Sequence, residues 1–134
     1  MAESTESADA GVLRLAAVVI DCPDPRELAG FYVGLLGWSV DEDASDDDWV
    51  EVADPAGGAN LAFQRDPDHL PPTWPDRERP QMLHLDVRVS DLSPTHERAL
   101  EAGARQLPQP QDRLDANFRV YADPAGHPFC LCAC

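Results

Sequence analysis

Basic residues are scarce in this sequence. It has 10 Lys and Arg against 25 Asp and Glu, which gives a net charge of −15 over 134 residues. Nucleic acids and anionic membrane surfaces are bound through basic patches, so the sequence argues against both as partners. The charge suits a cationic small molecule, and it also suits a protein that only needs to stay soluble. Both interpretations remain open.

Long apolar runs are absent too. No segment approaches the roughly 20 apolar residues of a membrane-spanning helix. Residues 1–12 lack the basic start and apolar centre of a signal peptide, so we expect a disordered leader and a cytoplasmic protein. The 4 cysteines are too few for a disulfide framework. In a cytoplasmic protein they are expected to be reduced thiols.

One short motif occurs twice. ADPAG stands at residues 53–57 and again at 122–126, about half the chain apart. A strand-like run that ends in aspartate precedes each copy, at 17–24 and at 84–91. Each run is followed by a predicted helix that ends at a glycine. Landmarks in the same order at nearly constant spacing predict a duplicated module.

The first helix has the clearest boundaries. Asp24 is suited to cap its N-terminus, Pro25 suits the first turn, and Gly37 suits the left-handed conformation that ends a helix. One apolar face at helical spacing is predicted to be buried. It is formed by Leu28, Phe31, Tyr32, Leu35 and Leu36.

Strands account for most of the remaining chain. They are expected at 14–22, 37–42, 48–53, 59–65, 82–89, 104–108, 116–122 and 128–133. Each half then has the order β-α-β-β-β. Prolines interrupt any pairing between the halves and predict a linker. We expect one domain over residues 13–134, with module one at 13–65, the linker at 66–80 and module two at 81–134.

The motifs resemble those of a known superfamily. The duplicated β-α-β-β-β unit, FYVGLLGW in the first helix, HLDV in the second half and DPAG before each last strand resemble the vicinal oxygen chelate superfamily. It includes glyoxalases, bleomycin-resistance proteins and extradiol dioxygenases. The resemblance covers nearly the whole chain from Leu13. It implies an α+β fold of two tandem βαβββ modules that form a curled mixed sheet around a cleft, and a homodimer.

The resemblance also implies positions for metal ligands. Metal-dependent members place one ligand on the first and last strand of each module. These positions fall on Ala17, near Gln64, on His84 and on Cys130. Alanine has no donor atom. His84, Cys130 and Gln64 are therefore an incomplete set, suited to zinc or ferrous iron if to any divalent metal. We expect no bound cofactor, with this metal site as the alternative.

Side chains alternate across a strand, and this predicts which residues face the cleft. His84, Asp86 and Arg88 share one face of their strand, with the intervening valine and leucine on the other. Asp86 can polarise His84 or pair with Arg88, and both roles stay open. The three C-terminal cysteines likewise share one face of the last strand, as small hydrophobic residues lining the cleft.

Candidate ligand-binding residues follow from the same alternation. Ala17 and Val19 are expected in the cleft wall. Trp49 and Trp74 are candidate aromatic walls for a flat ligand, although Trp74 is equally suited to pin the linker to the domain. The expected ligand-binding residues are Trp74, Trp49, Gln64, Arg88, Ala17 and Val19.

The sequence thus favours a cytoplasmic protein that binds a small organic molecule, with a degenerate metal site, as bleomycin-resistance proteins do. Two alternatives stay open. One is a divalent-metal-dependent lyase, isomerase or dioxygenase that uses His84, Cys130 and Gln64. The other is a metal-free acid–base enzyme in which His84 and Asp86 are catalytic.

Overall fold

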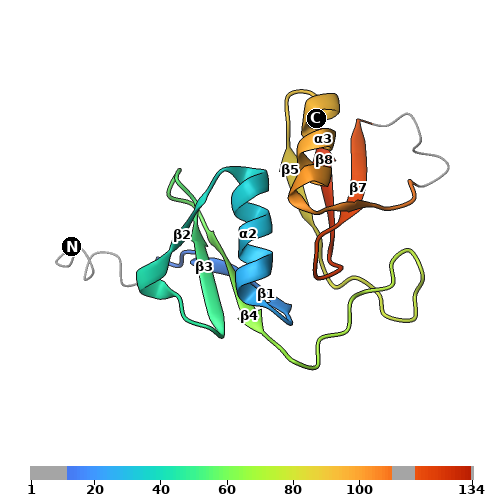
Figure 1. The fold of residues 1–134 in the computed structure, drawn as a ribbon. Coiled ribbons are helices and arrows are strands. Elements are labelled where there is room, and N and C mark those ends of the chain that lie inside the picture. The colour runs from blue at the N-terminus through green and yellow to red at the C-terminus, as the bar shows by residue number, and fades with distance from the viewer. Residues whose placement is uncertain (1–11, 110–116, 134) are drawn as a thin grey trace.

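The structure, a computed structural model, describes residues 12–109 and 117–133. Two modules of similar build stand side by side, and the linker runs beneath them from one to the other (Figure 1). Apart from Val12, the leader expected at residues 1–12 lies outside the described residues, as does Cys134.

Module one contains a four-stranded mixed sheet and one α-helix. Its elements are β1 (Ala17–Cys22), α2 (Pro25–Leu36), β2 (Ser39–Asp41), a short 3-10 helix (Glu42–Ala44), β3 (Trp49–Ala53) and β4 (Asn60–Arg65). The strand order is β1-β4-β3-β2. β1 lies parallel to β4, and the other two pairs are antiparallel.

Module two repeats this plan. Its elements are β5 (Leu85–Arg88), α3 (Leu92–Ala102), β6 (Arg105–Gln106), β7 (Phe118–Ala122) and β8 (Pro128–Cys132). The strand order is β5-β8-β7-β6, again with the first and last strands parallel. The expected α+β class with two tandem modules is confirmed. Among the described strands, no hydrogen-bonded ladder joins the two sheets, so they do not close into a barrel.

The helix boundaries follow the local signals in the sequence. The Asp24 side chain accepts a hydrogen bond from the Glu27 N–H at 3.3 Å, and Pro25 occupies the first turn. Gly37 has a left-handed φ of 76°, and its N–H donates to the Val33 carbonyl. These contacts satisfy backbone groups that have no partner at the ends of a helix.

The core extends across both modules. Tyr32 of α2 stacks on Phe63 of β4 with ring centroids 5.4 Å apart, and it also meets Phe129 of β8 edge-on. Phe31 contacts Phe129 as well, at 5.6 Å. Burying an aromatic side chain of this size contributes roughly 1.5–3 kcal/mol to stability. The modules of one chain therefore pack against each other through α2.

Alternation along the strands of module two is as predicted. Leu85 and Val87 pack against the core, whereas Asp86 and Arg88 are exposed. On β8, Phe129 and Leu131 are fully buried, and Cys130 between them lies half-buried on the opposite face.

The cysteines differ in their surroundings. Cys22 is fully buried in the core. The expectation of reduced thiols is wrong for Cys132, which is disulfide-bonded. It rested on the compartment alone, and a compartment carries no information on which sulfur atoms lie close together. In the described part of the chain, no helix has the length and apolar character needed to cross a membrane.

Candidate functional site

Three side chains with metal-binding atoms converge on the open face of the second sheet. His84 immediately precedes β5, Asp86 lies on β5, and Cys130 lies beside Asp86 on β8, because these two residues are partners in the parallel ladder. Their donor atoms all lie within 4.8 Å of one another. His84 Nε2 and Asp86 Oδ1 are 3.1 Å apart.

Within this cluster, the pKa of the Cys130 thiol is shifted. Partial burial, together with the charge of Asp86 and a hydrogen bond to it, raises the pKa of the Cys130 thiol to about 11. In the absence of a metal the thiol is therefore protonated at neutral pH, and a weak nucleophile.

Trp74 covers part of the same face. It packs from the linker against a small apolar cluster of Leu107, Val120 and Ala122, and Cys130 packs against the same cluster. The linker tryptophan thus lies in the neighbourhood of the polar cluster, and it also anchors the linker to module two.

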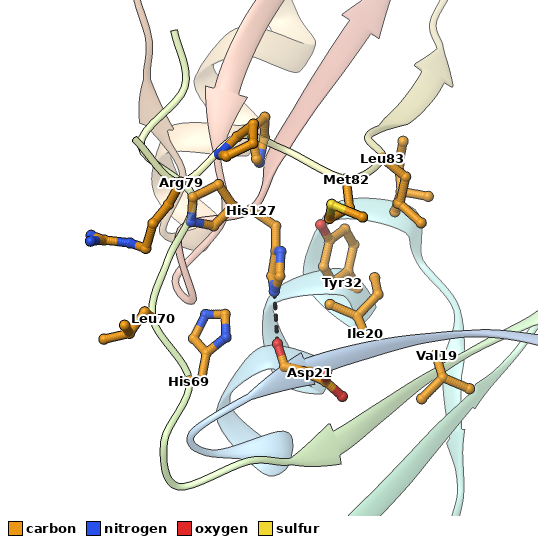
Figure 2. Close-up of a pocket in the computed structure, with 14 residues that line it drawn as sticks. Val19, Ile20, Asp21, Tyr32, His69, Leu70, Arg79, Met82, Leu83 and His127 are labelled. Carbon is orange, nitrogen blue, oxygen red and sulfur yellow. Dashed lines mark hydrogen bonds between the residues drawn. The ribbon is translucent and has the colours of Figure 1, made fainter. Parts of the chain in front are cut away.

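A separate cavity lies at the junction of the two modules. It has a volume of about 300 Å³. Its walls come from β1 and α2 of module one, from the linker, and from the β7–β8 turn of module two (Figure 2). The apolar walls include Val19, Leu70, Met82 and Leu83, which are between 41% and 91% exposed.

Two histidines form the polar side of this junction pocket. His127 Nε2 donates to the Asp21 carbonyl at 2.7 Å, and His69 Nε2 donates to the Ala125 carbonyl at 2.9 Å, since a carbonyl oxygen can only accept. The ring centroids are 5.0 Å apart. In each neutral ring Nδ1 remains an acceptor, so the pocket suits a ligand that carries a hydrogen-bond donor.

The turn that carries His127 is held by a buried carboxylate. Asp123 accepts hydrogen bonds from the Tyr32 hydroxyl at 2.8 Å and from the N–H groups of Ala125 and His127 at 3.0 Å. Burial raises the pKa of Asp123, more than these bonds and the nearby His127 lower it. The pKa of Tyr32 is also raised, first by burial and then by Asp123.

Comparison with known proteins shows the family. Residues 17–132 match the glyoxalase-like domain family. The chain belongs to this family. It is thereby a member of the vicinal oxygen chelate superfamily, as the motifs predicted. No match is found among curated proteins.

Several solved structures share the fold. A glyoxalase/bleomycin resistance protein/dioxygenase family enzyme from Burkholderia phytofirmans has a TM-score of 0.69 at 16% identity, covering 89% of this chain and 97% of its own. TnmS3, an antibiotic binding protein from Streptomyces, has a TM-score of 0.58 at 18% identity, covering 91% and 96%. A glyoxalase-related enzyme from Fulvimarina pelagi has a TM-score of 0.63 at 20% identity, covering 90% and 88%.

The metal that this superfamily often uses can be tested against the donors of this glyoxalase-like domain. Ala17 pairs with Asn60 and has no donor atom. Gln64 is exposed on β4 of the first sheet, beside Asp21. The side chains that converge with His84 and Cys130 include Asp86 instead. The implied positions therefore do not supply the ligands for a metal ion held between the two modules of this chain.

The structure separates the expected ligand-binding residues of this glyoxalase-like domain. Val19 lines the junction pocket. Trp74 lies near the polar cluster, whereas Trp49 is half-buried on β3, where its indole N–H donates to Glu51. Arg88 lies on β5 opposite Cys132 and lines a different cavity.

Sequence reasoning missed the two junction histidines. His69 stands in a proline-rich stretch assigned to the linker, and His127 directly follows the second ADPAG turn. The repeat itself contained a signal for His127. The first copy of the motif is followed by Gly58, which has no side chain, whereas the second copy is followed by a histidine. No local pattern connects either histidine with β1.

Proposed function

We propose that this protein binds a compact, mainly apolar organic molecule in the junction pocket. One observation carries the proposal: the cavity of about 300 Å³ combines an apolar wall with two imidazoles and the Asp21 backbone. Small-molecule sites are mostly apolar concavities with a few convergent polar groups, and their volumes begin at roughly 300 Å³. The same fold occurs in an antibiotic binding protein and in proteins described as enzymes, so the pocket, and not the fold, carries the proposal.

The ligand proposed for this pocket is a cation or a neutral donor. The acceptors are the imidazole Nδ1 atoms and the carboxylate of Asp21, and the net charge of −15 favours the approach of positive molecules. Arg79 also contributes to the lining. Its Nε donates to the Pro71 carbonyl, and in Figure 2 its guanidinium extends away from the other side chains.

A dye titration tests the pocket. The probe is N-phenylnaphthylamine, a neutral apolar dye that fluoresces when it leaves water. Leu70→Glu places a charge in the pocket wall at a residue that is 65% exposed, so the fold should tolerate it. We expect dye binding to weaken by about tenfold, because the bound dye would cover the carboxylate, and removing a charge from water opposes binding by about the corresponding 1.4 kcal/mol.

Leu100→Glu is the matched control. Leu100 is 40% exposed on α3 and does not line the pocket. Dye binding should be unchanged in this variant. Equal weakening in both variants, or in neither, would show that the dye adheres elsewhere and would contradict the proposal.

A second candidate function rests on the pair of His84 and Asp86. Their separation of 3.1 Å is that of a base and the carboxylate that orients it, as in a metal-free acid–base enzyme. His84→Ala should abolish such an activity and leave dye binding in the junction pocket intact. A metal-dependent lyase, isomerase or dioxygenase built on His84, Cys130 and Gln64 is less well supported, because Gln64 lies in the other sheet.

The homodimer and the cytoplasmic location remain predictions. Exposed apolar side chains support an association between copies of the chain: Leu13 is 95% exposed, Leu15 71% and Met82 91%.

A further inference from the structure

The cluster of His84, Asp86 and Cys130 differs from the metal site that the resemblance implies in the origin of its donor atoms. All three donors come from module two, on the adjacent parallel strands β5 and β8 or directly before them. The implied site would draw on both modules. A site within one sheet needs no particular arrangement of the modules, because the ladder itself sets the distances between its donors.

The backbone register brings these donors to one face. Asp86 and Cys130 are ladder partners, and His84 stands two residues before Asp86. Side chains two residues apart on a strand project to the same side, so the imidazole, the carboxylate and the thiol share the open face of the sheet. The His84 and Asp86 side chains are 43% and 67% exposed, which leaves access for an ion and for water.

The donor distances suit a single small cation. Zinc binds nitrogen and oxygen ligands at about 2.0–2.2 Å and sulfur at about 2.3 Å. Two tetrahedral ligands at such lengths lie about 3.3 Å apart, close to the 3.1 Å between His84 Nε2 and Asp86 Oδ1. The thiol sulfur lies within 4.8 Å of a ring nitrogen of His84 and of a carboxylate oxygen of Asp86, so a small side-chain adjustment brings it into range.

We propose that His84, Asp86 and Cys130 form a site for a soft divalent cation of the zinc class, contained in module two. Imidazole, carboxylate and thiolate are the ligand types zinc takes, and three protein ligands leave a fourth position for water. Binding forms a sulfur–metal bond and breaks the S–H bond of Cys130, and the proton passes to the buffer. The site is independent of the junction pocket, so either proposal can fail alone.

Cobalt(II) is the probe, because its spectrum reports the ligands directly. The full chain is purified with a chelator and a phosphine reductant, the chelator is removed, and Co²⁺ is titrated alone. We expect one equivalent to bind, with a thiolate-to-cobalt charge-transfer band in the near ultraviolet and the strong visible bands of tetrahedral cobalt. Added Zn²⁺ should displace the cobalt and bleach both.

Single substitutions identify the ligands. Cys130→Ser should remove the charge-transfer band, and Asp86→Asn and His84→Ala should each weaken Co²⁺ binding by more than about tenfold. All three side chains lie on the sheet face away from the main core, so the variants should fold, and their thermal transitions check this. The expected result is loss in each variant with the transition retained.

Two control variants complete the test. Asp43→Asn changes an exposed carboxylate in the 3-10 helix of module one and should leave the titration unchanged. Cys132→Ser tests the neighbouring sulfur and should keep the band. The proposal is overturned if wild type binds no stoichiometric cobalt, if the band survives Cys130→Ser, or if it disappears in Cys132→Ser.

Discussion

At the residue scale, the two DPAG turns show how one local sequence acquires two roles. Asp54 and Asp123 hold equivalent positions, and both accept hydrogen bonds from backbone N–H groups within their own turn. Only Asp123 also accepts from Tyr32, across the module junction. Among the described residues, Asp123 is the one charged side chain that is buried, with 4% exposure. Its ionisation is therefore coupled to the packing of the modules.

The raised pKa of Asp123 predicts a pH-dependent stability. In acid, below the ordinary value of 3.8, the carboxyl is protonated in both the folded and the unfolded state. As the pH rises from 3.8 to the folded pKa, only the unfolded state releases its proton, so the free energy of unfolding falls. Each unit of elevation corresponds to about 1.4 kcal/mol.

Asp123→Asn should abolish this fall, because an amide of the same shape does not titrate. Urea unfolding of both proteins across the acid range measures the effect. The stability of the variant relative to wild type should rise as the pH increases above 3.8 and then level off. A difference that does not change with pH would contradict the assignment.

Among the elements, each α-helix begins directly after an aspartate whose side chain caps its N-terminus. Asp24 caps α2 through the Glu27 N–H, and Asp91 caps α3 through the Ser93 N–H at 3.2 Å. Both caps follow a first strand, so each strand-to-helix connection is short and the helix returns across its own sheet. The caps thereby position α2 where its aromatic residues reach module two.

Asp24→Ala should cost about 1 kcal/mol, the usual penalty for losing a helix N-cap. The urea midpoint should fall with an unchanged m-value. Asp43→Ala, in the exposed 3-10 helix, removes the same charge without removing a cap and is the matched control. Equal losses in the two variants would mean that charge, and not capping, accounts for the effect.

At the scale of the whole molecule, the linker and the second turn shape the junction pocket together. Gly57 and Gly126 are equivalent glycines of the two turns, with φ of 86° and 92°. A Cβ at Gly57 would meet nothing within 4 Å, whereas a Cβ at Gly126 would overlap the Pro71 side chain. The linker therefore rests directly on the second turn, where His69 also bonds to Ala125.

Gly126→Ala should consequently destabilise the protein more than Gly57→Ala. Both substitutions strain a left-handed residue by about 1 kcal/mol, and the overlap with Pro71 adds roughly 1–3 kcal/mol. Displacement of the linker should also weaken dye binding in the junction pocket, because Leu70 and Pro72 form part of its wall. Thermal unfolding and dye titration measure both effects, and equal losses in the two variants would show that the linker does not rest on this turn.

Local signals in the chain predicted the elements, the duplication and the two faces of each strand. Asp24, Gly37 and the two ADPAG motifs act through neighbours in the chain, and alternation has a period of two, so such signals can be read locally. They were sufficient to predict that His84 and Asp86 share a face of one strand, and that the C-terminal cysteines share a face of the last strand. The superfamily followed from the same motifs.

Which of these residues contact one another depends on the tertiary structure. The parallel register of β5 and β8 brought Asp86, and not Gln64, to Cys130. The packing of α2 between the modules brought Asp21, His69 and His127 to one cavity. Contacts of this kind join segments far apart in sequence, and they depend on how whole modules bury their apolar faces. No short pattern around any one of these residues encodes that arrangement.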